Sequence, residues 1–484
     1  MKFNKIKTKI VLASVSISSS YILTKYYYKM PSLGIGYIAA VLEKNGYSVT
    51  IIDKSVSSQE TNCLADEILS SKPDVVGFYC FSENFKTIIE VLRIVKDKSP
   101  STITMIGGPH IYGLPEQGMG FDWIDYSFWG EAEESFLKLL DSNFDPDVFP
   151  QIDGLIYREN GRTKINRIAI ISDLDKLPLP ARNLYPPLDM YKPSILAYKR
   201  LPATGIITSR GCAHRCVFCH SGKGKFGLRF HSADYVLEEM KQLKRDFGIN
   251  ELVLFDDTFL INEPRALEIC EGIMREGLDL SWSMNARVNN INKDVLKILK
   301  RAGCWMIQLG VESGNRDILK TIKKGITLKR AEEACRLAYD EGFVVKTYFI
   351  LGHPNETEDT INDTIKFMTR LPSHYASINF MTPFPGTELW DIAEKYGTFD
   401  KEKLERINYL SDEPAFIPNG LTEELLKEKL REAYLKFYLN PRTIFRYFKA
   451  FRGLEDFKKT LMALSIILNI IYAKIFSKSS KENV

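Results

Sequence analysis

Short apolar runs alternate with amphipathic stretches along the first third of the chain. Five runs rich in β-branched and aromatic residues predict β-strands: KIVLASVS, YSVTIID, DVVGFYC, TITMIGG and WIDYSFW. Four stretches with apolar residues at helical spacing lie between or after them: GIGYIAAVLEKNG, CLADEILSS, FKTIIEVLRIVKD and EAEESFLKLL. Because parallel neighbours need crossover helices, this order predicts a doubly wound parallel sheet over residues 1–143, with a ligand crevice beyond the carboxyl ends of its strands.

The pattern changes near residue 144. The stretch NFDPDVFPQIDGLIYRENGRTKINR carries prolines and an ENGR turn typical of a hairpin. It is followed by LDKLPLPARNLYPPLDMYKP, in which prolines prevent a helix. We therefore predict a linker with a hairpin over residues 144–198.

A second alternation begins after the linker. Its predicted strands are TGIITS, ELVLFDD, LSWSMNA, CWMIQLGV, VVKTYFILG and ASINFMTP, with helical patterns between them. Six consecutive β–α units predict a partial TIM-type (β/α)6 barrel over residues 199–415, with functional groups on loops at the carboxyl ends of the strands. Residues 416–484 predict a basic helical region.

Composition and charge narrow the class of protein. With 65 basic against 61 acidic residues, the formal net charge of +4 gives no reason to expect a nucleic-acid partner. The cysteines are few and no secretory signal is present, which favours reduced thiols and a cytoplasmic protein. The apolar run over residues 461–473 is shorter than the ~20 residues of a spanning helix. An interfacial helix with weak membrane association and a packed terminal helix both stay open.

Three of the eight cysteines lie in the stretch SRGCAHRCVFCHSG, just after the first predicted barrel strand. Thiolates at Cys212, Cys216 and Cys219 are soft ligands that select iron–sulfur clusters, zinc or copper(I). Structural zinc usually takes four ligands, and no second CxxC is present, although His214 or His220 could complete a zinc site. A cluster held by three thiolates instead leaves one iron open for a substrate or cofactor.

The spacing CxxxCxxC, with the aromatic Phe218 before the last cysteine, resembles the cluster motif of radical S-adenosylmethionine (radical SAM) enzymes. In that family the three thiolates hold a 4Fe–4S cluster, and S-adenosylmethionine chelates the fourth iron. Electron transfer then cleaves the sulfonium to a 5′-deoxyadenosyl radical. The resemblance also implies an electron donor such as flavodoxin or ferredoxin, and sensitivity to oxygen.

Further motifs of the barrel resemble the same family: FDDTF, GVESGN and LGHPNETEDT end or follow its second, fourth and fifth strands. The carboxylates of Asp256, Asp257 and Glu312 could accept hydrogen bonds from the cofactor's ammonium and ribose groups, or Asp257, Ser313 and Thr357 could cap helices. Arg287 could pair with a cofactor carboxylate or form a structural ion pair. The resemblance implies the following S-adenosylmethionine contacts: Phe218, Asp256, Arg287, Glu312, Ser313 and Gly352.

In the N-terminal third, PSLGIGYIAAVLEKNGYSVTIID, GGPHIYGLP and DYSFWGEAEESF together resemble the Rossmann-like cobalamin-binding domain that precedes many radical SAM barrels. Glycines allow close backbone approach to a bulky ligand, and the resemblance implies cobalamin contacts at Gly107, Gly108, Gly130 and Glu131. No G-x-G-x-x-G follows the first strand, which disfavours a dinucleotide site.

The D-x-H-x-x-G segment that supplies a histidine ligand to cobalamin in some proteins is absent. His110 is the only histidine of this domain, and we interpret it as a hydrogen-bonded structural residue. The cysteines outside the motif are interpreted as buried small apolar residues: Cys63, Cys80, Cys270, Cys304 and Cys335. The tyrosine-rich loop over residues 21–31 could line the crevice above the corrin or pack on the barrel.

These observations predict a cobalamin-dependent radical SAM enzyme that methylates an unactivated carbon or phosphorus centre. Oxidative cyclisation or ring rearrangement with the same cofactors, as in the anaerobic magnesium-protoporphyrin cyclase, is the alternative. A zinc-stabilised binding protein without catalysis is the third hypothesis. The substrate is expected to be a small molecule or a peptide.

Overall fold

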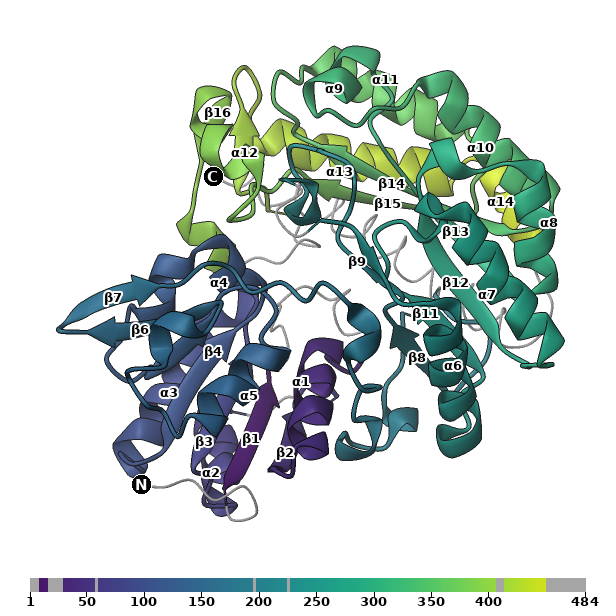
Figure 1. The fold of residues 1–484 in the computed structure, drawn as a ribbon. Coiled ribbons are helices and arrows are strands. Elements are labelled where there is room, and N and C mark those ends of the chain that lie inside the picture. Colours follow the sequence, from purple (N-terminus) through teal and green to yellow (C-terminus); the bar gives the residue numbers. More distant parts are fainter. Residues whose placement is uncertain are drawn as a thin grey trace.

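The computed structural model describes residues 8–15, 29–56, 60–194, 197–223, 227–405 and 413–449. The aromatic loop before residue 29 and the apolar run over residues 461–473 lie outside this part of the chain. Figure 1 shows two units, each a sheet with helices, that face each other across the middle of the molecule. The fold is mixed α/β with two mainly parallel sheets.

The first sheet has the strand order β2-β1-β3-β4-β5-β6-β7, in which β1 to β5 are parallel. Its parallel strands are β1 (Lys9–Ser14), β2 (Ser48–Asp53), β3 (Val75–Tyr79), β4 (Ile103–Gly107) and β5 (Tyr126–Phe128). The helices of this unit are α1 (Leu33–Lys44), α2 (Thr61–Ser70), α3 (Phe85–Lys98), α4 (Pro109–Gly113) and α5 (Glu133–Asp141). All five strands predicted from the sequence are present.

The alternation of side chains along β1 divides the core of this unit in two. Ile10 and Leu12 pack with residues of α1 and α5, whereas Val11 and Ala13 pack with residues of α2 and α3. Helices therefore cover both faces of the sheet, as the alternating pattern predicted. One cysteine prediction is wrong, because Cys63 is exposed on α2 while Leu64 and Ile68 of the same helix face the core.

The predicted hairpin is present as β6 (Leu155–Glu159) and β7 (Arg162–Ile165), but it does not lie in a free linker. It extends the first sheet, with β6 antiparallel to β5. Leu155 and Ile156 are fully buried there. The edge of the short strand β5 is thereby covered, which satisfies backbone groups that a sheet edge would otherwise expose.

The second sheet contains the six predicted strands, all parallel, in the order β15-β14-β13-β12-β11-β8. They are β8 (Ala203–Ile206), β11 (Glu251–Leu254), β12 (Ser281–Ala286), β13 (Cys304–Glu312), β14 (Val344–Leu351) and β15 (Tyr375–Phe380). The connecting helices are α6 (Ala233–Phe247), α7 (Glu263–Arg275), α8 (Lys293–Arg301), α10 (Leu328–Asp340) and α11 (Glu358–Arg370). Among the described residues β8 and β15 do not pair with each other, so the sheet is open rather than a closed barrel.

Smaller elements complete this unit: α9 (Arg316–Thr321), α12 (Glu388–Ile392), α13 (Glu423–Tyr438), α14 (Pro441–Lys449), β16 (Gly397–Phe399) and β17 (Phe416–Pro418). Helix α13 covers the free edge of β15 with two hydroxyl groups. The Tyr434 hydroxyl lies 3.3 Å from the amide nitrogen and 3.0 Å from the carbonyl oxygen of Ile378, and Tyr438 makes the same contacts with Ala376 at 3.4 and 3.0 Å. Two tyrosines four residues apart on the helix thus contact the backbone groups of two residues that lie two apart on the strand.

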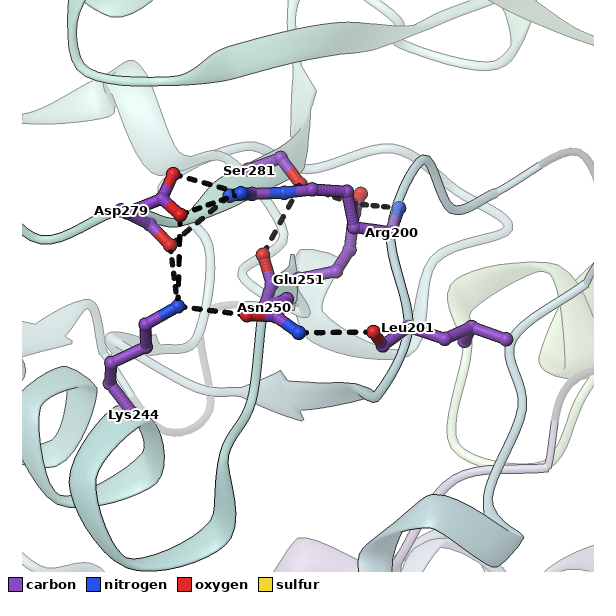
Figure 2. A network of polar contacts seen from close by, with 7 residues as sticks. All are labelled: Arg200, Leu201, Lys244, Asn250, Glu251, Asp279 and Ser281. Carbon is purple, nitrogen blue, oxygen red and sulfur yellow. Dashed lines mark hydrogen bonds and ion pairs between the residues drawn. The ribbon is translucent and has the colours of Figure 1, made fainter. Parts of the chain in front are cut away.

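The amino-terminal ends of β8, β11 and β12 are joined by the polar network of Figure 2. Glu251 is fully buried and accepts hydrogen bonds from the Ser281 hydroxyl and, at 3.0 Å, from the Arg200 amide. The Arg200 guanidinium in turn holds Asp279 at 2.8 Å. Burial raises the pKa of Glu251. This network organises the end of the sheet opposite the predicted functional loops.

In the described part of the chain, no helix combines the length and apolar character needed to cross a membrane.

Candidate functional site

A cavity of about 670 Å³ lies where the two units meet. From the first unit it is lined by residues at or after the carboxyl ends of β3, β4 and β5, including Tyr79 and Gly107. From the second unit it is lined by the segments that follow β8 and β11, including Ser221 and Asp257. The carboxyl ends of both parallel sheets therefore contribute to one cavity, and its volume is typical of ligand sites.

The three clustered cysteines lie on a loop with a hairpin stem, formed by β9 (Ser209–Arg210) and β10 (Arg229–Phe230). Cys212 and Cys216 are buried and Cys219 is partly buried. Gly211 has φ +85°, and a Cβ at this position would lie 2.1 Å from the Gly227 carbonyl oxygen, so only glycine fits the stem. We call residues 211–228 the cysteine loop.

The protein surroundings do not by themselves favour thiolates on this loop. Burial raises the pKa of Cys212, and burial followed by the neighbouring Asp257 raises the pKa of Cys219 to about 12. Arg287 offers one compensating contact, since its Nη1 lies 3.6 Å from the Cys216 sulfur. A bound cation would therefore supply most of the charge that stabilises the thiolates.

Arg287 contacts Cys216, and a residue that we did not predict, Lys324, connects Arg287 with Glu312. The Lys324 ammonium donates to Glu312 Oε1 at 2.7 Å, and both side chains are at least nine-tenths buried. Arg287 donates from Nη2 to the Lys324 carbonyl. A side chain at Gly310 would collide with this ion pair, because its Cβ would lie 2.5 Å from Glu312 Oε1. Glu312 itself adopts φ +71°, a strained backbone conformation of the kind found at functional sites.

Asp256 is more deeply embedded than its neighbour. It accepts hydrogen bonds from the Thr208 amide at 2.7 Å and from the hydroxyls of Thr208 and Ser209 at 2.6 and 2.5 Å. Burial raises its pKa. Asp256 thus organises the segment before the cysteine loop, whereas Asp257 lines the cavity. Neither aspartate caps helix α7, whose N-cap is Asn262.

Ser313 and Gly352 organise loops after β13 and β14. The buried Ser313 hydroxyl lies 3.1 Å from that of Thr364. Gly352 has φ +86°, and its amide donates to Glu356 at 2.5 Å. Burial raises the pKa of Glu356 to about 8. Thr357 caps helix α11, as the alternative interpretation of this motif predicted.

Phe218 packs with the apolar group of Val217, Leu319 and Ile322 that supports the cysteine loop. Its ring is only partly buried. The Val217 amide also donates to the Ile322 carbonyl at 3.2 Å. Phe218 is therefore held at the cysteine loop by packing from the segment after β13.

All four residues predicted to contact cobalamin line the cavity: Gly107, Gly108, Gly130 and Glu131. Two of these glycines are also required by close backbone packing. At Gly108 (φ +112°) a Cβ would lie 2.9 Å from backbone atoms of Cys80, and at Gly130 (φ +104°) it would lie 2.3 Å from the Ala169 carbonyl oxygen. At Gly107 the nearest contact of a Cβ would be an ordinary 3.6 Å.

His110 behaves as a structural residue, as predicted. Its ring nitrogens lie 3.1 Å from the Ser82 hydroxyl and 2.9 Å from Gln117 Oε1, and the ring stacks on Phe85 at a centroid distance of 4.0 Å. Burial lowers its pKa. Both ring nitrogens have hydrogen-bond partners within the protein.

Four charged residues join the first unit to the stem of the cysteine loop, and we call them the arginine clamp. The Glu131 carboxylate accepts two hydrogen bonds from Arg229, at 2.6 and 3.0 Å, and forms an ion pair with Arg210 at 3.2 Å. Arg210 also donates to Glu133 at 2.8 Å. The two arginines are direct partners across the β9–β10 hairpin.

The clamp is largely shielded from water, since each side chain is at most 14% exposed. Burial alone would raise the pKa of Glu131, but the hydrogen bond from Arg229, the charge of Arg210 and the hydrogen bond from the Ile171 amide lower it. Arg210 also lies over the ring of Tyr37, 5.0 Å from its centroid. The sequence held one signal for this arrangement, an arginine two residues before the first motif cysteine, but not its acidic partners.

Comparisons with known proteins agree with this geometry. Residues 206–368 match the model of the radical SAM superfamily, and residues 19–140 match that of the B12 binding domain. An uncharacterized methyltransferase of Pyrococcus horikoshii, PH0819, is 34% identical over 420 residues, which cover 86% of this chain and 89% of that protein. The anaerobic magnesium-protoporphyrin IX monomethyl ester cyclase of Rubrivivax gelatinosus is 26% identical and covers 85% of this chain and 74% of its own.

Solved structures show the same fold. The cobalamin-dependent S-adenosylmethionine radical enzyme OxsB, with aqua-cobalamin and S-adenosylmethionine bound, superimposes with a TM-score of 0.72 at 18% identity, over 93% of this chain and 72% of its own. The radical S-adenosylmethionine methyltransferase TsrM from Kitasatospora setae gives 0.67 at 16% identity, over 89% and 88%. The chain belongs to the cobalamin-dependent radical SAM enzymes. Its radical SAM domain implies a 4Fe–4S cluster and S-adenosylmethionine, and its B12-binding domain implies cobalamin.

The donor set suits a cluster better than one metal ion. Within the described ranges, no three His, Cys, Asp or Glu side chains converge closely enough to hold a single ion. A lone zinc ion binds each thiolate at ≈ 2.3 Å and needs such convergence, whereas a four-iron cluster spreads its three thiolates over different irons. For cobalamin, the glycines and aromatic rings of the cavity wall give the backbone access and apolar surface that a large planar ligand requires.

Proposed function

We propose that the protein is a methyltransferase that transfers a methyl group to an unactivated carbon or phosphorus centre of a small-molecule substrate. The supporting observation is that one cavity is lined both by the cysteine loop and by the carboxyl ends of the B12-binding sheet. A radical source and a methyl donor thereby share one reaction space. The similarity to a protein named as a methyltransferase over 86% of the chain supports the same activity.

The cluster, S-adenosylmethionine and cobalamin supply the radical and the methyl group when bound; the protein binds and orients them. We assign the cluster to Cys212, Cys216 and Cys219. We assign S-adenosylmethionine to Phe218, Arg287, Glu312, Ser313 and Gly352, and we assign Asp256 to the support of this site, because Thr208 and Ser209 occupy its carboxylate. We assign cobalamin to the cavity walls formed by Gly107, Gly108, Gly130 and Glu131.

Within this assignment each described contact has a role. Arg287 positions Cys216 and donates to its sulfur. Lys324 holds the Glu312 carboxylate toward the space above Gly310 and partly neutralises it. Asp256 and Glu356 act on backbone amides and thereby hold the loops that carry the cofactor contacts. The shielding of these groups from water strengthens their electrostatic effect.

We further propose that the second sheet is a partial barrel and that the units divide as residues 1–143, 144–198, 199–415 and 416–484. The hairpin of the second segment associates with the first sheet. Radical SAM methyltransferases need a reductant, for which we propose flavodoxin or ferredoxin. The cytoplasmic location remains a prediction from the cysteine content.

Anaerobic reconstitution with iron and sulfide tests the cluster assignment. The wild type is expected to turn brown with 4Fe–4S absorbance, and Cys→Ala at Cys212, Cys216 or Cys219 should abolish that absorbance and 5′-deoxyadenosine formation. Cys335→Ala is the matched control, because this buried cysteine lies on α10 and should leave the cluster intact. Copurified zinc without a reconstituted cluster would refute the assignment in favour of the zinc-stabilised binding protein.

Methyl-labelled S-adenosylmethionine separates methyl transfer from the second candidate reaction. The similarity to the Rubrivivax gelatinosus cyclase over 85% of the chain favours oxidative cyclisation as that candidate. Cell extract supplies candidate substrates, and labelled small molecules are identified by mass spectrometry. Substrate consumption with 5′-deoxyadenosine formation but without label in any product would exclude methyl transfer and support cyclisation.

A further inference from the structure

The inner face of the second sheet carries a lysine that no function described above uses. Along β14 the residues alternate between buried and partly exposed positions. Val345, Phe349 and Leu351 belong to the core that includes residues of α10 and α11. Successive side chains of a strand point to opposite faces, so Lys346 and Tyr348 lie on the face away from these helices. Figure 1 shows the helices on the outer side of this sheet.

This face leads toward the cysteine loop. Ile350, on the same face, packs in the apolar group that contains Val217 and Phe218 of that loop. At about 3.3 Å per residue, Lys346 lies roughly 13 Å from Ile350 along the strand. Lys346 is therefore in the same unit as the proposed cluster site, but nearer the amino-terminal end of the strand.

Neighbouring strands place amide groups beside Lys346. In the register of the sheet Lys346 is opposite Gln308 of β13, and Gln308 is opposite Asn285 of β12, so all three side chains share one face. The Tyr348 hydroxyl donates to Gln308 Oε1 at 2.6 Å, which leaves the Gln308 NH₂ group as a donor. The Lys346 ammonium lies 4.6 Å from the centroid of the Tyr348 ring.

Lys346 is partly exposed, and it differs from the buried lysines Lys324 and Lys429 in having no anionic partner among the described residues. Lys324 pairs with Glu312 at 2.7 Å, and Lys429 pairs with Glu358 at 2.8 Å. Among the residues that the structure describes, no carboxylate comes within 4.0 Å of the Lys346 ammonium, while Gln308 is its register neighbour on the adjacent strand. Burial lowers the pKa of Lys346 to about 8, as expected for a cation without a neutralising partner.

We propose that Lys346 and Gln308 bind an anionic group of the substrate, a carboxylate or a phosphate, on the inner face of the sheet. The ammonium supplies the charge and the Gln308 amide a neutral hydrogen bond, a combination suited to either anion. This inference rests on the proposed function. It implies a substrate whose methylated centre lies roughly 13 Å from its anionic group, because the strand spans about that distance between Lys346 and Ile350, which packs at the cysteine loop.

The carboxylate of S-adenosylmethionine is a second source of the same chemistry, but the resemblance places it at the cluster. Competitive acetylation of the reconstituted enzyme distinguishes the two sources. The rate of Lys346 modification by acetic anhydride is followed by peptide mass spectrometry with no addition, with inorganic phosphate or with S-adenosylmethionine alone. The exposed Lys329 is the control within the same sample.

We expect inorganic phosphate to slow acetylation of Lys346 at least fivefold, to leave Lys329 unchanged, and S-adenosylmethionine alone to have no effect. Protection by S-adenosylmethionine but not by phosphate would transfer the site to the cofactor and overturn the substrate assignment. No protection by either compound would overturn the anion site itself.

Two variants test the anion site without acetylation. Lys346→Met should weaken phosphate binding at least tenfold by calorimetry, whereas Lys346→Arg, which keeps the charge, should retain most of it. The 4Fe–4S absorbance of both variants reports whether the fold is intact. Equal phosphate affinity in wild type and a folded Lys346→Met variant would refute the proposal. A protein that reconstitutes no cluster but still binds phosphate at Lys346 would count against the proposed cluster assignment while leaving the anion site standing.

Discussion

Replacing Glu131 with glutamine should loosen the cysteine loop without removing any group from it. The Glu131 carboxylate accepts hydrogen bonds from Arg229 at 2.6 and 3.0 Å and from the Ile171 amide at 2.6 Å, and it forms an ion pair with Arg210 at 3.2 Å. Glutamine keeps one oxygen but presents an NH₂ group where the second oxygen was. Donors would then face donors at the stem of the loop.

The expected cost comes from the two contacts of one carboxylate oxygen. Oε1 accepts a hydrogen bond from Arg229 at 3.0 Å and forms an ion pair with Arg210 at 3.2 Å, and a hydrogen bond to a charged group contributes ≈ 1.5–3 kcal/mol. Because Glu131 is 13% exposed, water can partly replace these bonds, and we expect a net cost of about 2–4 kcal/mol. At 1.4 kcal/mol per factor of ten, this corresponds to roughly 30- to 700-fold faster local opening.

Hydrogen–deuterium exchange measured by mass spectrometry on peptides from the cysteine loop checks this prediction. Asp153→Asn is the matched control. Its pair with Arg167 is also bidentate, at 2.7 Å for both contacts, but the arginine is 82% exposed. Exposed pairs contribute at most about 1 kcal/mol, so the control should leave exchange in the loop unchanged. Unaltered exchange in Glu131→Gln, or equal changes in both variants, would refute the clamp.

Three further predictions concern groups with defined partners. Because burial raises the pKa of Glu356 to about 8 from 4.5, the folded protein keeps a proton that the unfolded chain releases, and stability should fall as pH rises from about 4.5 to 8. Glu356→Gln should remove that part of the slope in urea unfolding, and parallel wild-type and variant profiles would contradict the reasoning. Replacing both Tyr434 and Tyr438 with phenylalanine should lower the free energy of unfolding by about 2–4 kcal/mol, and a loss below about 1 kcal/mol would contradict their edge role. Arg287→Met should lower the reduction potential of the reconstituted cluster in an EPR-monitored titration, because the Cys216 sulfur loses a hydrogen bond; an unchanged potential would refute that contact.

The strands of both sheets could be predicted from the sequence, because each strand is a short run rich in β-branched residues. The stretches that flank these runs have apolar residues at helical spacing. It did not predict that β6 would join β5, because nothing local in a hairpin specifies which sheet edge it covers. Cys63 was assigned to the core because its helix was judged by overall apolar content, whereas the side that faces the sheet is set by Leu64 and Ile68.

In the candidate site, too, some residues could be predicted from the sequence and others could not. The three motif cysteines could be found from spacing alone, because a loop cluster needs ligands close in sequence. The groups that hold the stem of their loop come from distant parts of the chain, as in the pair of Glu131 with Arg229, 98 residues apart. Lys324 was missed because it follows a short helix rather than a strand, and its pairing with Glu312 depends on the left-handed turn at the end of β13.

The paired tyrosines of α13 have a consequence for the life of the chain before folding is complete. A parallel strand such as β15 exposes a row of backbone donors and acceptors that can recruit a strand from another molecule. During synthesis this edge remains uncovered until residues 434 and 438 have emerged and α13 has docked. A chain that ends before α13 is therefore expected to form sheet-edge aggregates at ribosomal exit, even though its radical SAM strands are all present. We therefore expect α13 to protect the chain from edge-to-edge aggregation as well as to complete the fold.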